Sequence, residues 1–139
     1  MGKTSLGPYI FFNGQAKEAM EFYKSIFGGN LEIQTMGEVP DEIRQEAGNP
    51  DPSRVMHAKL EADGFTLFAS DSAKASDKSA KVELSLMGDD AEKLKKFFEG
   101  LSAGGKVNMP LSKQFWGDEF GMVTDKYGVD WMVNINSTT

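Results

Sequence analysis

The sequence predicts an α+β protein in which one strand–helix–strand–hairpin unit occurs twice along 139 residues. Residues 54–70 and 115–134 each place an apolar run on either side of a turn, which is the pattern of a β-hairpin. Residues 15–27 and 91–101 repeat apolar side chains at three- and four-residue spacing, and a glycine pair follows each. Each half therefore contains an amphipathic helix followed by a hairpin.

The first half begins with residues 9–12, a wholly apolar run that indicates a buried strand. Asn13 is placed to cap the helix of residues 15–27. Residues 31–36 alternate well enough for a second strand, and the hairpin of residues 54–70 follows, with its turn at the Asp-Gly pair. This half therefore supplies four strands and one helix.

A long connection, residues 37–53, separates the second strand from the hairpin. It contains three prolines and five acidic residues, and residues 41–47 have the composition of one helical turn. Loops of this length inside a compact domain are often lids or binding loops, but surface insertions also collect in them. Both interpretations stand at this point.

The second half follows residues 72–80, which are small, polar and aperiodic and so predict a linker. Residues 82–87 predict a strand, and Asp89 and Glu92 are spaced for reciprocal capping of the next helix. Residues 106–109 predict a further short strand before the last hairpin. We expect a single domain, residues 1–139, with modules at 8–71 and 81–136, since neither module alone buries its helix stripe and sheet face.

Composition narrows the classes of function. The chain has no cysteine, which excludes disulfides, thiolate metal sites and a thiol nucleophile. Its net charge of -6, with Lys and Arg scattered singly, argues against nucleic acid or an anionic membrane surface as partner. No segment has the pattern of a signal peptide or a membrane span, so a soluble, cytoplasmic protein is expected.

Three segments make the chain recognisable: PYIFFNGQAKEAMEFYKSIFGG, VMHAKLEADGFTLFASD and FWGDEFGMVTDKYGVDWM. Across residues 8–136 the chain closely resembles the PhnB-like branch of the vicinal oxygen chelate superfamily, also called the glyoxalase/bleomycin resistance/dioxygenase superfamily. The resemblance implies two βαβββ modules in an open eight-stranded, barrel-like cup with helices outside, and a homodimer. Many members are labelled 3-demethylubiquinone 3-methyltransferase, but the chain has no glycine-rich strand-to-helix turn that would cradle a nucleotide-like cofactor.

The resemblance also implies where a divalent metal would bind, because metal-dependent relatives use His, Gln or Glu at four strand positions. These positions fall here on Pro8, on or near Phe68, and on Lys81 and Met132. None of the four side chains is a hard-cation or imidazole ligand, and a lysine ammonium repels a cation. We therefore expect no cofactor, and a metal only at a non-standard place.

The polar candidates for catalysis are His57, Glu83 and Glu119. Strand alternation puts His57 on one face with Lys59 and Glu61, opposite Met56, Ala58 and Leu60. His57 is interpreted either as a general base or lone ligand, or as a half-buried histidine hydrogen-bonded to a carboxylate or the backbone. Under the repeat, Glu119 is its mate in the second hairpin, which makes the two candidates for one cavity.

The fifth strand offers a polar face of Lys81, Glu83 and Ser85. Glu83 would be the acid or base and Lys81 an anion anchor; a solvated face or a Lys-Glu pair is the other interpretation.

The remaining ligand-binding candidates are mainly aromatic. Phe115, Trp116 and Phe120 would wall a hydrophobic pocket, although Trp116 would equally suit the core or a dimer contact. Phe12 and Met132 complete the predicted set. Of Trp131 and Met132, one is expected in the core and the other in the cup, and Asp125 is expected to shape its own turn.

Two functions remain. The first is a metal-independent binder of a small organic molecule held between aromatic walls. The second is an enzyme of the lyase, isomerase or dioxygenase type, with a non-standard metal or with His57, Glu83 or Glu119 transferring protons. A scaffold without a small ligand is a third possibility, and it predicts a cup filled by side chains.

Overall fold

The computed structural model describes residues 7–46, 48, 51–71 and 82–137. The chain divides into two compact units, Met1–Ser79 and Ala80–Thr139, and each is described by itself. The predicted linker of residues 72–80 and Lys81 lie outside the described residues. Within the described residues the strands form two four-stranded sheets, and no helix is long and apolar enough to cross a membrane.

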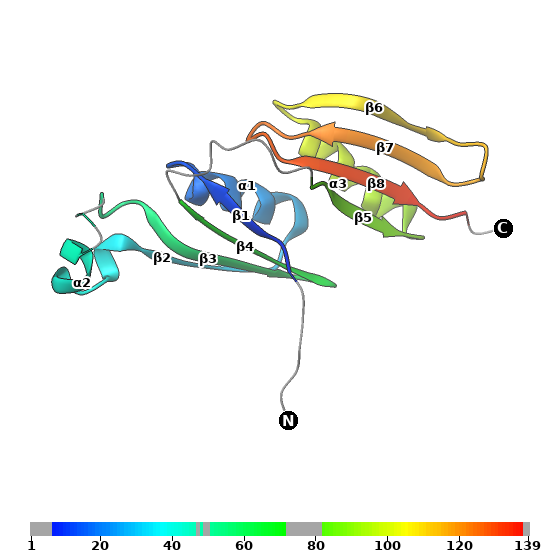
Figure 1. Cartoon of the computed structure of the whole chain (residues 1–139). Coiled ribbons are helices and arrows are strands. Elements are labelled where there is room, and N and C mark those ends of the chain that lie inside the picture. The colour runs from blue at the N-terminus through cyan, green and yellow to red at the C-terminus, as the bar shows by residue number, and fades with distance from the viewer. Residues whose placement is uncertain (1–6, 47, 49–50, 72–81, 138–139) are drawn as a thin grey trace. The chain divides into compact units, whose positions relative to one another are not determined.

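The first unit is a βαβββ module (Figure 1). Its elements are β1 (Tyr9–Phe12), α1 (Ala16–Phe27), β2 (Asn30–Thr35), β3 (Val55–Ala62) and β4 (Phe65–Asp71). The sheet order is β1-β4-β3-β2, with β1 parallel to β4 and the other pairs antiparallel. The predicted strands, helix and hairpin are confirmed to within one or two residues.

The helix α1 packs against one face of this sheet (Figure 1). Its stripe of Ala19, Met20 and Tyr23 is fully buried, as are Ala58 and Leu60 of β3. Burial of this apolar surface supplies the main stabilisation of the module. The face opposite α1 carries the other side chains of each strand, because successive residues of a strand point to opposite sides.

A β-bulge alters the predicted alternation at the start of β3. Gln34 pairs with His57 and Thr35 with Val55, so Met56 is an extra residue between two pairs. Val55 is buried, whereas Met56 is exposed. The expectation that Met56 shares the core face with Ala58 was therefore wrong, since the bulge moves Val55 into that place.

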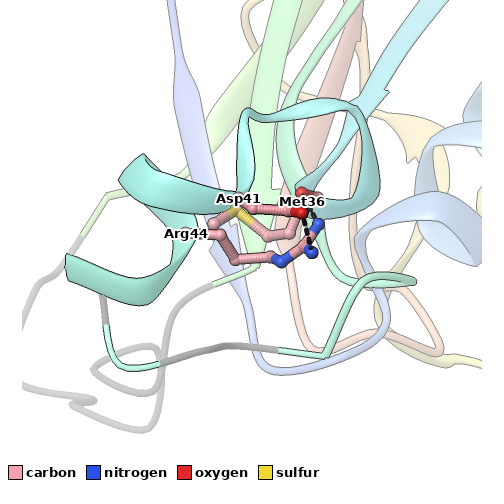
Figure 2. A network of polar contacts seen from close by, with 3 residues as sticks. All are labelled: Met36, Asp41 and Arg44. Carbon is pink, nitrogen blue, oxygen red and sulfur yellow. Dashed lines mark hydrogen bonds and ion pairs between the residues drawn. The ribbon is translucent and has the colours of Figure 1, made fainter.

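The connection between β2 and β3 has structure of its own. It contains η1 (Met36–Glu38) and α2 (Asp41–Glu46), which confirms the predicted helical turn. The guanidinium of Arg44 donates to Asp41 Oδ1 at 2.6 Å and to the Met36 carbonyl at 3.4 Å, and so joins α2 to η1 (Figure 2).

The second unit repeats the order strand, helix and three strands. Its elements are β5 (Leu84–Gly88), α3 (Ala91–Ser102), β6 (Lys106–Lys113), β7 (Glu119–Thr124) and β8 (Asp130–Ile135), in sheet order β5-β8-β7-β6. The strand β6 runs to Lys113 rather than ending at Met109. It continues through Pro110 because it lies at the sheet edge, where a missing N–H breaks no central ladder.

The two predicted helix caps were wrong in detail. Asp90, not Asp89, accepts the Lys93 N–H at 3.1 Å at the start of α3. At the start of α1, Asn13 accepts a bond from Arg54, and the carboxylate of Asp71 receives the N–H groups of Gly14 (2.8 Å) and Ala16 (3.0 Å). The cap of α1 comes from a neighbouring strand, and the cap of α3 lies one residue later than predicted. The spacing of residues near each helix start reveals neither of these facts.

The two glycine pairs that follow the helices occupy corresponding places in the two units, as predicted. A methyl group at Gly29 would collide with the Glu61 carbonyl, and one at Gly105 with the Thr124 carbonyl. In each unit, a glycine after the helix therefore lets the chain pass against the end of the third strand.

Asp125 shapes its own turn, as predicted. Its Oδ1 accepts the N–H groups of Tyr127 (2.9 Å) and Val129 (3.0 Å), and its Oδ2 accepts the Trp131 indole N–H at 2.9 Å. Trp131 is 2% exposed and belongs to the core, while Met132 lies on the other face, which confirms their predicted division.

Candidate functional site

Four ring side chains gather on the face opposite α1 in the first unit. Tyr9 and Phe11 come from β1, Phe68 from β4 and His57 from β3; we call this set the aromatic cluster. The Tyr9 ring is stacked on Phe68 with centroids 6.1 Å apart, and Phe11 lies 5.1 Å from Tyr9. His57 lies 5.8 Å from Phe68 and 6.0 Å from Tyr9. The four rings form one continuous surface.

The local sequence explains this arrangement. Alternation along β1 sends Tyr9 and Phe11 to one side and Ile10 and Phe12 to the other. Tyr9 pairs directly with Phe68, which brings the two rings together. Tyr9 and Phe11 are 43% and 56% exposed, so the prediction of a buried strand at residues 9–12 was wrong for this face of β1.

Phe12, a predicted ligand-binding residue, does not belong to the cluster. It is buried in the core, on the side of β1 opposite Phe11. The sequence reasoning missed Tyr9 and Phe11, although the alternation of the run YIFF was a signal for them.

The imidazole of His57 has a defined partner. Its Nδ1 lies 3.3 Å from the Tyr9 hydroxyl oxygen, which is a long hydrogen bond. His57 is half-buried, and its bond goes to a phenol rather than to the carboxylate or backbone group of the simpler prediction. The histidine thus sits at the edge of the aromatic cluster with a polar neighbour on one nitrogen.

Charged side chains border the cluster. Lys59 pairs with Phe68 on one side and with Glu32 on the other in the sheet register. Its ammonium binds Glu61 Oε1 at 2.8 Å, and this hydrogen bond, with the charge of Glu61, raises the pKa of Lys59. The face opposite α1 is therefore aromatic toward β1 and β4 and charged toward β2 and β3.

In the second unit, the face opposite α3 carries methionine side chains and Phe120 beside polar side chains such as Asn134. Met132 pairs with Ser85 of β5 and Met122 of β7, so these three side chains are neighbours. Phe120 pairs with Asn134 on the same face. The structure thus brings together three of the predicted ligand-binding residues: Ser85, Phe120 and Met132.

The loop between β6 and β7 carries the other two aromatic candidates. The Trp116 ring lies 6.2 Å from Phe120 and 5.0 Å from Phe115. Phe115 is 96% exposed. Neither residue belongs to the core of this unit, which removes one of the three predicted interpretations.

Glu119 lies on the helix side of its sheet. Its carboxylate is 3.7 Å from Lys95 of α3, and it shares a face with the buried Val123. His57 lies on the face of its sheet opposite the helix, so the prediction that the two occupy equivalent places was wrong. Glu83 is exposed and precedes β5, which begins only at Leu84.

The positions that the family resemblance implies for a metal do not offer suitable ligands among the described residues. The Pro8 carbonyl accepts the Phe68 N–H at 3.0 Å, the Phe68 ring stacks on Tyr9, and Met132 offers a thioether, which is a soft donor. Across the described ranges, no three His, Asp or Glu side chains are grouped to hold an ion. The fourth position, Lys81, lies outside the described residues.

Comparison with known proteins covers nearly the whole chain. A family model described as 3-demethylubiquinone-9 3-methyltransferase matches residues 4–134. Protein YjdN of Escherichia coli (strain K12) is 34% identical over 140 residues, covering 94% of this chain and 94% of that protein. The crystal structure of protein PA1353 from Pseudomonas aeruginosa is 35% identical, with a TM-score of 0.81 over 97% of this chain and 99% of that one.

A more distant structure shares the fold alone. It is described as a glyoxalase/bleomycin resistance protein/dioxygenase family enzyme from Burkholderia phytofirmans PsJN, with 16% identity and a TM-score of 0.61 over 95% of this chain and 98% of that one. The predicted fold class, α+β with two βαβββ modules of the glyoxalase/bleomycin resistance type, is confirmed.

Proposed function

We propose that this chain, which belongs to the family whose model is described as 3-demethylubiquinone-9 3-methyltransferase, binds a small organic molecule without a metal ion. The observation that carries this proposal is the aromatic cluster on the face opposite α1. Small-molecule sites are lined mainly by apolar and aromatic side chains with a few polar groups that fix orientation. Tyr9, Phe11 and Phe68 supply the aromatic surface, and His57 supplies the polar group.

The family description names a methyl transfer, but the strand-to-helix turn argues against a nucleotide-like cofactor. In α/β folds that bind nucleotide-like cofactors, a glycine-rich strand-to-helix turn leaves room and free N–H groups for the cofactor. Here the N–H groups of Gly14 and Ala16 already donate to the carboxylate of Asp71. A nucleotide-like cofactor at this turn would therefore meet a carboxylate instead of free donors.

Metal independence is supported by the chemistry of the donor set. A proline, a phenylalanine and a methionine stand at three of the four family metal positions, and none offers the oxygen or imidazole that hard or borderline divalent ions prefer. Binding by this chain would instead rest on ring stacking and on one or two hydrogen bonds.

The test is a screen of small aromatic compounds against protein treated with a chelator, followed by two variants. Phe11→Ala removes a ring of the cluster, while Ile43→Ala in α2 is a matched control, since the two side chains are 56% and 55% exposed. We expect Phe11→Ala to weaken binding about tenfold, the equivalent of about 1.4 kcal/mol for a lost aromatic contact, with Ile43→Ala unchanged. Binding only after a divalent ion is added, or equal loss in both variants, would refute the proposal.

A second candidate function is proton transfer, which the 3.3 Å contact between His57 and Tyr9 favours. Histidine exchanges protons near neutral pH and is the commonest general acid or base. Under this alternative, His57→Gln keeps affinity for a bound compound but abolishes its conversion, as followed by mass spectrometry of the compound. Unchanged compound in the wild-type protein would leave binding as the only function.

A further inference from the structure

The pair formed by Tyr9 and His57 carries an inference about the class of ligand. We propose that Tyr9 is a positioning residue that keeps the proton of neutral His57 on Nε2, so that the ring presents an N–H donor to an uncharged acceptor group on a planar ligand. The ligand part of this inference rests on the proposed binding function. The part that concerns the imidazole does not.

The direction of the hydrogen bond follows from the chemistry of the two groups. The Tyr9 oxygen and His57 Nδ1 are 3.3 Å apart, and either atom can carry the hydrogen between them. A phenol is a better donor than acceptor, because its oxygen lone pair is delocalised into the ring, whereas an unprotonated imidazole nitrogen is a good acceptor. Donation from Tyr9 to Nδ1 leaves the proton of the neutral ring on Nε2.

The surrounding rings restrict the orientation of the imidazole. The His57 ring is tilted 34° from Phe68, at 5.8 Å between centroids, and 41° from Tyr9 at 6.0 Å. Tyr9 is itself stacked on Phe68, with 11° between the ring planes. A planar ligand that stacks on Phe68 or Tyr9 would therefore lie beside the imidazole, whose second nitrogen carries the proton under this proposal.

The charges on this face favour an uncharged acceptor over an anion. The ammonium of Lys59, beside Phe68, is bound to Glu61 at 2.8 Å and also lies opposite Glu32. One lysine and two glutamates give this part of the face a charge of -1. A carboxylate on the ligand would meet net repulsion, and a cation would meet the Nε2–H donor, so a carbonyl oxygen fits best.

The protonation state is measurable directly because the chain contains one histidine. In ¹⁵N NMR spectra at about pH 9, where a histidine side chain is ordinarily neutral, the two ring nitrogens report which one carries the proton. We expect Nε2–H in the wild-type protein and a shift of about fivefold toward Nδ1–H in Tyr9→Phe, the effect of one hydrogen bond of ordinary strength. Tyr127→Phe removes a hydroxyl in the other unit and is expected to leave the ratio unchanged.

Predominant Nδ1–H in the wild-type protein, or an unchanged ratio in Tyr9→Phe, would overturn the role of Tyr9. Both ¹⁵N measurements are made on the protein without a ligand. Because Tyr9→Phe keeps the ring and Tyr9 is partly exposed, this variant retains the stacking on Phe68.

The ligand class is tested with 1-indanone and indane, which have similar shape and differ by one carbonyl oxygen. We expect 1-indanone to bind about fivefold more tightly than indane, and this preference to shrink in Tyr9→Phe. Indane binding as tightly as 1-indanone would overturn the acceptor class but leave the proposed binding function intact. If neither compound changes the NMR chemical shifts of His57 and of the aromatic cluster, the cluster does not bind planar ligands. The role of Tyr9 is then decided by the ¹⁵N spectra of the His57 ring alone.

Discussion

The substitution of Asp125 tests how the second unit is held together. Asp125 is 3% exposed, and its carboxylate accepts hydrogen bonds of 2.9 to 3.0 Å from two backbone N–H groups and from the Trp131 indole. Asp125→Ala leaves a buried indole N–H without its acceptor, which costs about 1–3 kcal/mol, and removes two backbone bonds of about 1 kcal/mol each. We expect a total loss of about 3–5 kcal/mol, a large share of the about 5–15 kcal/mol that stabilises a typical domain.

Asp125→Asn separates the indole bond from the backbone bonds. The amide oxygen can keep both backbone N–H groups, but the amide nitrogen then faces the Trp131 N–H, so we expect a smaller loss of about 1–3 kcal/mol. Urea denaturation followed by circular dichroism gives the free energy of unfolding for each variant. Asp51→Ala, which removes an exposed turn carboxylate that accepts the Ser53 N–H, is the control and is expected to change stability little.

A double-mutant cycle refines this prediction. In a Trp131→Phe background the indole N–H is absent, so Asp125→Asn should lose most of its effect, with a coupling of about 1–3 kcal/mol. Equal losses of unfolding free energy for Asp125→Ala and Asp125→Asn, or no coupling with Trp131→Phe, would show that the bond from the Trp131 indole to Asp125 contributes little to the stability of the unit.

Three further predictions concern single residues. Asp71→Ala frees the N–H groups of Gly14, Ala16 and Val55 and should lower stability by about 2–4 kcal/mol in urea denaturation; an effect below about 0.5 kcal/mol would contradict its role as cap of α1. The Asn134 amide, and next the Ser137 N–H, lower the pKa of Asp118 from its ordinary value of 3.8, so its stabilising contribution is present above that value and is lost as the pH falls through the folded-state value. Denaturation curves of Asp118→Asn should show a weaker loss of stability below about pH 4 than the wild type, and parallel curves would contradict this. Gly105→Ala should lower the melting temperature, because the added methyl group would collide with the Thr124 carbonyl. An unchanged melting temperature would contradict this and show that the backbone moves there at little cost.

The order and type of the elements were predictable because their signals are local. The spacing of Ala19, Met20 and Tyr23 specifies the buried stripe of α1, and the Asp63-Gly64 pair specifies the first hairpin turn. The bulge at Met56 was not predictable, because it is set by pairing with β2 rather than by the sequence of β3. The same holds for the cap that Asp71 supplies across 55 to 57 residues of sequence.

The candidate site was predicted only in part, and Glu119 shows why. The overlay of the two halves aligned their hairpin turns, but β3 ends at Ala62 on the helix side, whereas β7 ends one residue past the buried Val123. An offset of one residue moves a side chain to the other face of a sheet. The prediction therefore placed Glu119 with His57 when its carboxylate points toward Lys95 of α3.

The two units carry different side chains on the sheet faces away from their helices. On the helix sides, the two units are built alike. Aliphatic strand residues such as Leu60 and Val133 are buried under a helix, and a glycine after the helix lies against the third strand. On the opposite faces, the first unit carries stacked rings with a histidine, and the second carries Phe120 beside methionine side chains. A face that only met water would need no such rings, because polar side chains solvate a sheet surface at lower free energy. The rings and the histidine on the face opposite α1 are therefore the observation on which the proposed binding of a small molecule rests.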